Sequence, residues 1–256
     1  MTHRISETRQ KEQRRFLALC LPYLPTNRLR LTGVAPGDRP LAVVEKVKGA
    51  LRLVAVDARA EGMGLAPGLV LAAARARVPD LHVVPHDPSA DLALLERLVD
   101  WADRYTPFVA LDPSMGLTLD ITGCVHLFGG EAEMRADILR RIRNRGYGVR
   151  ATIAGTQGAA RALARHTRGG IVPRGRDADA VRPLSVAVLD LPGRDTLALV
   201  RAGLKSIGDL ADRPRKTLTA RFGTGLTERL DQILGRIEVP LNPRRPVAGV
   251  MAERRF

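Results

Sequence analysis

The first two-thirds of the sequence alternates apolar runs of strand length with segments of helical periodicity. Phe16–Leu24 is the first apolar run, and it is bounded by a polar arm and by Pro25, as is typical of a buried strand. Residues 90–105 instead repeat their apolar side chains at helical spacing. A chain of 256 residues with this patterning can bury a substantial core and is long enough for about two domains.

The last third of the sequence has a different character. Its helical segments are punctuated by glycine and proline, as in Leu191-Pro192-Gly193 and again at Gly203 and Gly208. Glycine and proline are the strongest turn formers. The pattern therefore predicts short helices that are joined by tight turns.

The charge of the chain indicates its class of partner. The formal net charge is +14, and only five of the 41 basic residues are lysine. Such a surplus favours a polyanionic partner, and arginine suits bidentate contacts to phosphate. No apolar run reaches the ~18 residues of a membrane helix, and the two cysteines, Cys20 and Cys124, lack the spacing of a zinc site. We expect a cytoplasmic, nucleic-acid-binding protein with no membrane partner.

Two segments resemble the palm motifs of Y-family (translesion) DNA polymerases. Pro113–Thr122 reads PSMGLTLDIT and is similar to the family motif SIDEAYLDVT, whose Asp-Glu pair lies at a two-metal site. Phe16–Leu24 reads FLALCLPYL and resembles the family's opening strand, HIDMDAFF. In this alignment Cys20, Met115 and Gly116 stand where the family has metal-binding carboxylates. A thiol, a thioether and a glycine cannot hold Mg²⁺, which prefers oxygen ligands.

No shift of register restores the missing pair, because the chain contains no two adjacent acidic residues. Two-metal phosphoryl transfer needs carboxylates that hold two cations roughly 3.5–4 Å apart. Asp112 and Asp120 flank the motif and could supply one ligand, although Asp120 fits the structural end of the strand better. We predict no catalytic residue, no metal site and no cofactor. Mg²⁺ would be needed only if the metal ligands were rearranged.

Two arginines occupy places where the resemblance implies contacts to a nucleoside triphosphate. Arg59 lies in DARAEGMG, which is similar to the fingers motif YEARKFGV. Arg161 follows IAGTQG, where active members carry APNK with a triphosphate-binding lysine; Gln157 takes the place of that lysine. Without metal ligands, we expect Arg59 and Arg161 to form only a vestigial nucleotide site. The alternative for Arg59 is a solvent-facing side chain after a strand.

Residues 191–210 resemble the helix-hairpin-helix of the Y-family thumb, IPGVGKK followed by LGIKTIGDL. In such a hairpin, backbone N–H groups at a helix start bind a DNA phosphate without reading sequence. Asp195 replaces the second hairpin glycine, and an acid there repels phosphate. The alternative is a purely structural helix pair. The residues expected to contact DNA are Gly193, Arg194, Lys205, Ser206, Gly208, Arg215 and Lys216.

The resemblance covers about residues 16–240 and implies an α+β fold. The palm would be a ferredoxin-like antiparallel sheet with helices on one face. It would adjoin a fingers domain and be followed by a small all-α thumb with a helix-hairpin-helix, and the little finger is expected to be absent. The expected segments are a disordered basic arm at 1–15, palm at 16–30 and 79–170, fingers at 31–78, thumb at 171–240, and a linker to a missing little finger at 241–256.

The chain combines LPYLPT in place of the family's DMD, a degenerate Asp-Glu motif, the retained Ala58-Arg59 and IAGT in place of IAPNK. This combination resembles the catalytically silent, ImuB-like subgroup of the bacterial mutasome. That resemblance implies a non-catalytic DNA-repair adaptor of the SOS response, with weak affinity for DNA. The partners that it implies are DNA, a sliding clamp, an error-prone C-family polymerase and a RecA-like accessory protein. Two alternatives stay open: an active Y-family polymerase with rearranged metal ligands, and a free-standing helix-hairpin-helix DNA-binding module.

Overall fold

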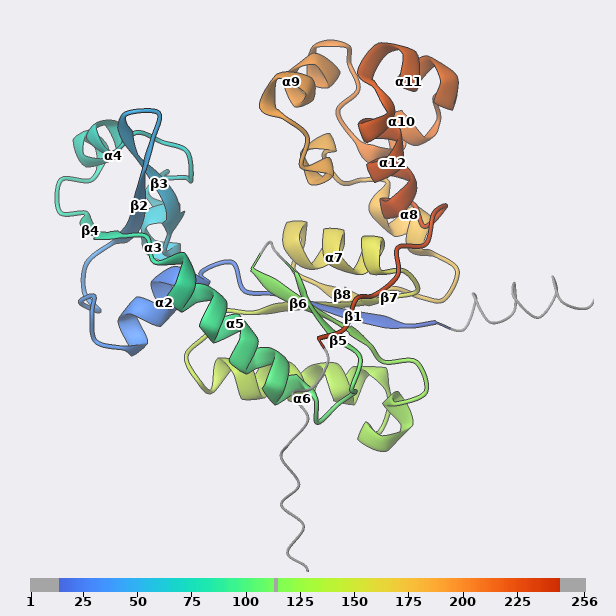
Figure 1. Cartoon of the computed structure of the whole chain (residues 1–256), viewed down its shortest axis with the longest axis horizontal. Helices are drawn as coiled ribbons and strands as arrows, with labels where there is room; N and C mark the ends of the chain where they lie inside the picture. Colours follow the sequence, from blue (N-terminus) through green and yellow to red (C-terminus); the bar gives the residue numbers. More distant parts are fainter. Residues whose placement is uncertain (1–13, 113–114, 245–256) are drawn as a thin grey trace, which may run out of the picture.

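The computed structural model describes residues 14–112 and 115–244. Its largest sheet has five strands in the order β5-β6-β1-β7-β8 (Figure 1). The strands are β1 (Phe16–Cys20), β5 (Val109–Asp112), β6 (Gly116–Asp120), β7 (Arg150–Ala154) and β8 (Gly170–Ile171). Central β1 pairs antiparallel with both β6 and β7, whereas β8 pairs parallel with β7. The antiparallel palm is therefore confirmed except for this short edge strand.

Helices cover both faces of this sheet (Figure 1). Every residue of β1 is buried, and its side chains alternate between the two faces. Phe16, Ala18 and Cys20 pack on the face that α7 covers. Leu17 and Leu19 pack on the opposite face, with α5 and α6. The expectation of helices on one face only is wrong, because the uninterrupted apolar run of β1 needs cover on both sides. These helices are α5 (Pro88–Ala102), α6 (Glu131–Arg143), preceded by the 3-10 helix η1 (Val125–Phe128), and α7 (Gln157–His166).

A second, three-stranded sheet has the order β3-β2-β4 and forms the core of the fingers. Its turn between β2 and β3 is Lys48-Gly49, with φ values of 50° and 83°, as the preferred hairpin turns require. β4 pairs parallel with β2, so residues 82–85 belong to this sheet and not to a palm that begins at residue 79. The intervening helices provide the crossover that a parallel pair needs. The elements are α2 (Leu24–Leu31), β2 (Leu41–Val47), β3 (Ala50–Val56), α3 (Ala58–Gly62), α4 (Leu71–Arg77) and β4 (His82–Pro85).

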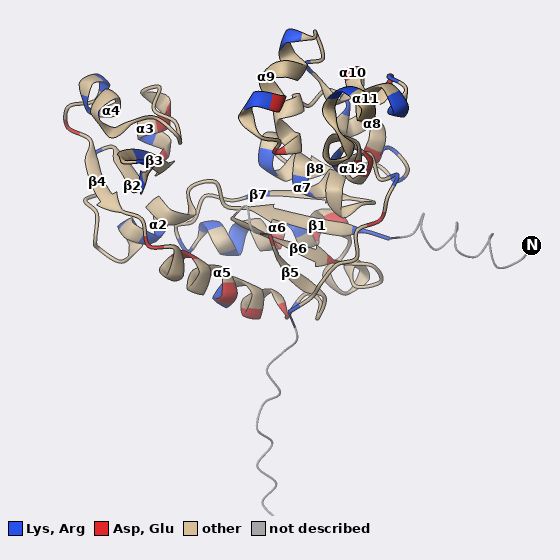
Figure 2. Ribbon diagram, turned by 45° about the horizontal axis from the view of Figure 1, so that its top comes forward, with Lys and Arg blue, Asp and Glu red and all other residues tan. Residues whose placement is uncertain are grey.

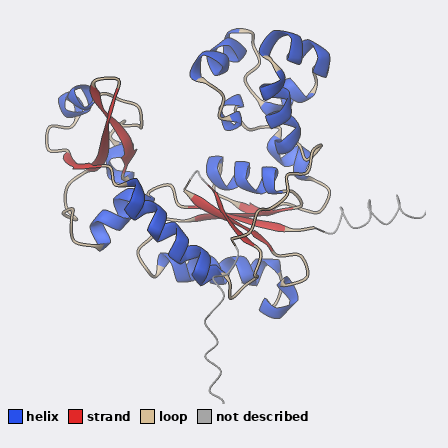
Figure 3. Cartoon of the chain, in the orientation of Figure 1, coloured by secondary structure: helices blue, strands red, loops and turns tan. Residues whose placement is uncertain are grey.

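From residue 177 to 244, every regular element is a helix (Figure 3). Leu199 and Leu230 of this region belong to the same buried cluster as Phe16 of β1. The expected all-α thumb is therefore confirmed, and its core is continuous with that of the palm. The elements are α8 (Asp177–Val181), η2 (Val186–Leu189), α9 (Gly193–Arg201), α10 (Ile207–Ala211), α11 (Arg215–Phe222) and α12 (Thr224–Ile233). None of the helices in the described chain combines the length and apolar character of a membrane span.

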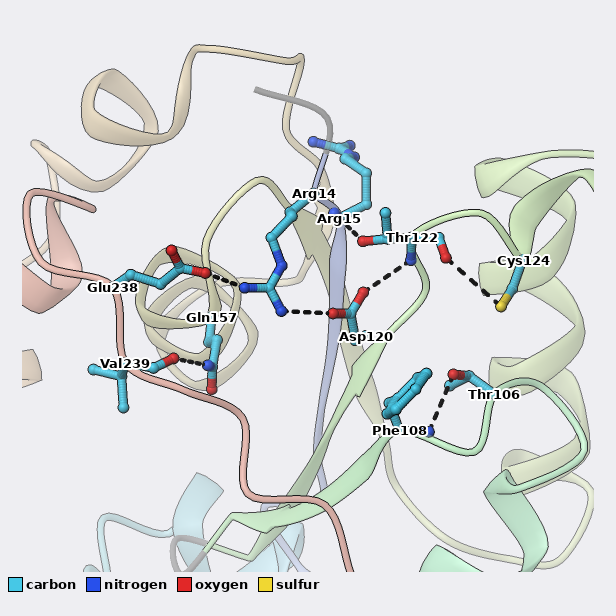
Figure 4. Close-up of polar contacts among 10 residues, drawn as sticks. All are labelled: Arg14, Arg15, Thr106, Phe108, Asp120, Thr122, Cys124, Gln157, Glu238 and Val239. Carbon is cyan, nitrogen blue, oxygen red and sulfur yellow. Dashed lines mark hydrogen bonds and ion pairs between the residues drawn. The ribbon is translucent and has the colours of Figure 1, made fainter. Parts of the chain in front are cut away.

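The first described residues are fixed to the palm. Arg15 is buried, and its guanidinium donates to the two carboxylate oxygens of Glu131 at 2.8 and 2.6 Å. Arg14 pairs with Asp120 at 2.9 Å (Figure 4). These two arginines are thus packed and not part of a disordered arm, because each has an acidic partner on the palm. The remainder of that predicted arm, residues 1–13, lies outside the described residues.

The last described residues also contact the palm. The backbone N–H of Arg244 donates to the carbonyl of Val109 at 3.0 Å, next to the exposed edge of β5. Its side chain pairs with Asp100 of α5 at 3.1 Å. Residue 244 is therefore docked on the palm and does not behave as a free linker. The rest of the predicted linker, residues 245–256, lies outside the described residues.

Candidate functional site

Two of the three degenerate palm positions lie side by side at one end of the sheet. Cys20 ends β1 and is paired directly with Gly116, the first residue of β6. Asp112 ends β5 and pairs with Gly116 from the other side. Met115 precedes β6, and its carbonyl accepts a hydrogen bond from the N–H of Leu21 at 2.9 Å. The fold therefore gathers the candidate metal positions and Asp112 at the junction of three strands.

The backbone at Gly116 leaves no room for a side chain. A Cβ atom there would lie 2.2 Å from the carbonyl oxygen of Leu19, far inside van der Waals contact. The preceding Met115 has a φ of 65°, in the left-handed region that residues other than glycine seldom adopt. A carboxylate could not be placed at position 116 unless the backbone of β1 or β6 moved. The loss of metal ligands thus involves the main chain as well as the side chains.

Asp112 is held by two arginines of α7. Its side chain is buried, and Arg161 donates to its two oxygens from Nε at 2.8 Å and from Nη2 at 2.6 Å. Nη2 of Arg165 lies 3.5 Å from the same carboxylate, and its Nη1 pairs at 2.6 Å with Asp190, which follows η2 in the thumb. Residues four apart on a helix share a face, so α7 presents both guanidinium groups to one acid. Hereafter the arginine cluster denotes Asp112, Arg161, Arg165 and Asp190.

The residues at this position do not fit the two divalent ions that the fold family implies. Burial raises the pKa of the Cys20 thiol; Arg150 and Arg165 oppose this effect, and Asp112 adds to it. The thiol is therefore protonated at neutral pH and is not a thiolate ligand. Within residues 14–112 and 115–244, no group of three or more His, Cys, Asp and Glu side chains is arranged to hold a metal ion.

Asp120 is too far away to replace the missing ligands. It ends β6 opposite Phe16, at the far end of β1 from Cys20. Asp120 lies four residue steps along the extended strand from Gly116, which is about 13 Å at the usual rise per residue. Its carboxylate is already bound by Arg14 at 2.9 Å and by the N–H of Thr122 at 3.0 Å (Figure 4). Asp120 therefore stabilises the end of the strand.

The two arginines expected at a vestigial nucleotide site lie on different domains. Arg59 is an exposed residue of α3 in the fingers, where it donates to the backbone carbonyl of Asp38. Arg161 lies on α7, which covers the palm sheet (Figure 1), and its main partner is Asp112. Each arginine therefore has its own local acceptor, and neither contact involves the other arginine.

Gln157 lies at the opposite end of the sheet from Cys20. β7 runs antiparallel to β1, so α7 starts near the first residue of β1 and runs back over the sheet. The amide of Gln157 donates to the carbonyl of Val239 (Figure 4). Gln157 thus contacts the segment after α12, whereas Arg161 and Arg165 carry the contacts of α7 to Asp112, next to Gly116.

The start of α10, one of the predicted DNA contacts, is closed by the chain itself. Oδ2 of Asp209 accepts hydrogen bonds from the backbone N–H groups of Lys205 and Ser206, both at 2.9 Å. The Ser206 hydroxyl accepts from the N–H of Asp209 at 3.1 Å, which completes a capping box. The N–H of Gly208 donates to the carbonyl of Arg182 at 2.9 Å. The backbone N–H groups of this turn therefore already have acceptors within the chain, and the DNA contacts of Lys205, Ser206 and Gly208 stay a prediction.

The starts of α9 and α11 are open instead, and neither has a side-chain cap. Gly193 and Arg194 are exposed, and the Arg194 side chain retains 87% of its accessible surface. α11 begins with Arg215 and Lys216, of which Arg215 pairs with the buried Asp231. Figure 2 shows basic segments on both helices. Free N–H groups at a helix start, beside basic side chains, favour phosphate.

Three residues where α7 meets the thumb make contacts that were not predicted from the sequence: Arg165, Asp190 and Arg229. Arg229 of α12 donates to the carbonyls of Leu189 and Asp190, both at 2.6 Å. The four-residue spacing of Arg161 and Arg165 was the one available signal, because such a spacing places both side chains on one face wherever the segment is helical. Asp190 and Arg229 come together only through the packing of the thumb on α7.

Comparison with known proteins identifies the family. Residues 35–165 match the impB/mucB/samB family. Protein ImuB of Caulobacter vibrioides is 46% identical over 187 residues, which cover 73% of this chain and 41% of that protein. DNA polymerase IV of Dehalococcoides mccartyi is 28% identical over 194 residues, which cover 73% of this chain and 49% of that protein. The chain therefore spans less than half the length of these relatives.

Solved structures share the fold. DinB from Sulfolobus solfataricus superimposes with a TM-score of 0.71 at 15% identity, covering 89% of this chain and 69% of that one. An insertion ternary complex of Dbh DNA polymerase gives a TM-score of 0.70 at 14% identity, with the same coverage. At such identities the likeness concerns the fold alone. Because a family model matches half of its length and its fold agrees, this chain belongs to the impB/mucB/samB family of Y-family polymerase-like proteins and is similar to the member named ImuB.

Proposed function

We propose that this chain is the polymerase-like part of a non-catalytic adaptor in translesion DNA synthesis. The observation that carries the proposal is the site at Cys20, Gly116 and Asp112. The first two lack a carboxylate, and the third is engaged by Arg161 and Arg165. Two-metal transfer needs carboxylates that hold both cations against the attacking and leaving oxygens. Guanidinium groups bind phosphate, but they do not coordinate and activate an attacking hydroxyl.

We further propose that the chain binds DNA weakly and without sequence preference through its thumb. The open starts of α9 and α11, with Arg194 and Lys216, support this part of the proposal. With a net charge of +14, affinity should fall steeply as salt rises, because binding releases counterions from the phosphates. A helix-hairpin-helix module that acts alone is less well supported, because Leu199 of the thumb shares its core with Phe16 of the palm.

The similarity to Protein ImuB extends the proposal to partners. An adaptor of this kind would bring an error-prone C-family polymerase and a RecA-like accessory protein to a sliding clamp during the SOS response in the cytoplasm. It would need no metal or other cofactor of its own. Its contribution would be to position DNA and partner proteins, a role for which a polymerase-shaped surface is sufficient.

A primer-extension assay tests the loss of catalysis. The protein is incubated with a labelled primer–template, all four deoxynucleotides and either Mg²⁺ or Mn²⁺, and we expect no extension with either ion. Binding of the same duplex is measured in parallel, so that inactivity is not confused with a failure to bind DNA.

The competing function, an active polymerase with rearranged ligands, makes the opposite prediction. It requires robust extension that disappears in Asp112→Ala or Asp120→Ala. The matched control is Asp103→Ala, since Asp103 is an exposed acid at the end of α5 and would leave such an activity intact. Extension with this dependence would refute the adaptor proposal.

A further inference from the structure

A cavity of about 290 Å³ lies between α7 of the palm and the thumb. Three arginines line it: Arg161 and Arg165 come from α7, and Arg229 comes from α12. We propose that this cavity binds the phosphate group of a nucleic acid or a nucleotide without the help of a metal ion. It is distinct from the open starts of α9 and α11, which do not line it.

Two of these arginines have guanidinium nitrogens to spare. Arg161 donates to Asp112 from Nε and Nη2, which leaves Nη1 without an acceptor among the described residues, and its side chain is 36% exposed. Arg229 is exposed and uses only Nη1, for the carbonyls of Leu189 and Asp190. The spare donors of Arg161 and Arg229 thus line one cavity from two helices. This arrangement suits a tetrahedral anion, because charge-assisted hydrogen bonds from arginine to phosphate are among the strongest in proteins.

The local balance of charge also favours an anion. Arg161, Arg165 and Arg229 face two carboxylates, those of Asp112 and Asp190, so one positive charge is left over. Nε of Arg165 is buried and has no hydrogen-bond partner within the described chain. In a recess where water is partly excluded, an uncompensated positive charge attracts an anion more strongly than it would in bulk water.

The cavity lies close to the palm positions that lack metal-binding carboxylates. Arg161 reaches from it to Asp112, which adjoins Gly116 and, across β6, Cys20. Fixed cations are therefore built into the chain beside the positions that lost their metal ligands. The inference rests on the proposed loss of catalysis in one respect: it assigns to arginines the neutralisation of phosphate that metal ions would otherwise provide. The donors and the charge balance stand independently of that proposal.

The test compares Arg229→Gln with Arg97→Gln in the presence of EDTA. Arg229 is chosen because it is exposed, whereas replacing Arg161 would leave a buried acid poorly paired. Arg97 is an exposed arginine of α5, so both variants lose the same charge. Pyrophosphate binding is measured by titration calorimetry, and binding of a labelled DNA duplex by fluorescence anisotropy. We expect Arg229→Gln to weaken binding about tenfold, the loss of one charge-assisted hydrogen bond, and Arg97→Gln to change it little.

The two probes separate the sources of the phosphate. An effect of Arg229→Gln on pyrophosphate alone identifies a free or nucleotide phosphate as the ligand, and an effect on the duplex alone identifies the DNA backbone. Circular dichroism checks that each variant is folded, and Arg229→Lys, which keeps the charge but not the fork, should retain part of the affinity. If Arg229→Gln and Arg97→Gln behave alike with both probes, the phosphate site is refuted. The adaptor proposal would survive that result, because it depends on primer extension.

Discussion

Gly116 lies where β6 begins beside β1, and the carbonyl of Leu19 fills the space that a side chain would need. Because of this crowding, replacing Gly116 by an acid would not restore the carboxylate in place. The side chain would force the hairpin of β5 and β6 to move away from β1. Asp112, the one carboxylate beside it, already has Arg161 and Arg165 as partners. Restoring a single acid would therefore not rebuild a two-metal site.

Replacing Gly116 by alanine should destabilise the protein by about 1–3 kcal/mol, as expected for overpacking against a backbone atom. Gly170→Ala is the matched control, because a Cβ atom there meets nothing within 4 Å. The free energy of unfolding is measured by urea denaturation for both variants. Equal stabilities would mean that β1 and β6 separate easily at this point, and the steric argument against a carboxylate would fail.

At the scale of elements, three helix starts in the thumb differ in how their backbone N–H groups are satisfied. The starts of α9 and α11 have no side-chain cap, whereas α10 carries the reciprocal Ser206–Asp209 capping box. A capping box supplies from within the chain the acceptors that a phosphate would otherwise provide. The uncapped starts of α9 and α11 therefore leave N–H groups open to an external acceptor, as the proposed DNA contact requires.

A substitution at an open helix start should lower the affinity for DNA, whereas one at the capped start of α10 should lower the stability of the fold. Arg194→Gln should weaken DNA binding and lower the slope of log affinity against log salt by about one, as for the loss of one phosphate contact, while stability stays unchanged. Ser206→Ala should lower the free energy of unfolding by about 1 kcal/mol, as for the loss of an N-cap, with no effect on DNA affinity. Anisotropy at several salt concentrations and urea denaturation provide the two readouts. A loss of DNA affinity in Ser206→Ala would show that α10 does take part in binding.

Features that depend on neighbouring residues could be predicted from the sequence, whereas features that depend on contacts between distant segments could not. The apolar run predicted to begin at Phe16 starts where β1 starts, and the helical repeat predicted at 90–105 overlaps α5, because both patterns are local signals. The substitutions at Cys20 and Gly116 were likewise visible in the motifs. The parallel pairing of β4 with β2 and the salt bridges of Asp112 were not, since both depend on contacts between segments far apart in the chain.

For the whole molecule, the buried clusters divide the chain differently from the expected domain boundaries. The thumb and one face of the palm sheet share a single core, and Arg165 bridges them by pairing with both Asp112 and Asp190. The fingers have cores of their own and stand apart from the sheet in Figure 1. Ion pairs such as that of Arg28 with Asp91 at 2.6 Å connect α2 to the palm helix α5. We infer that palm and thumb form one cooperative unit and that the fingers can open separately.

Hydrogen exchange should reveal these two units. Leu199→Ala, in the thumb, and Leu53→Ala, in the fingers, each remove a fully buried side chain and should cost about 2–5 kcal/mol. Leu199→Ala should lower amide protection in β1 and α7 as well as in the thumb, because all three line one core. Leu53→Ala should lower protection mainly within residues 41–85, since local unfolding follows cooperative units. Were Leu199→Ala to affect the thumb alone, the thumb would be an independent unit, and a free-standing DNA-binding module would become the better description of the last third of the chain.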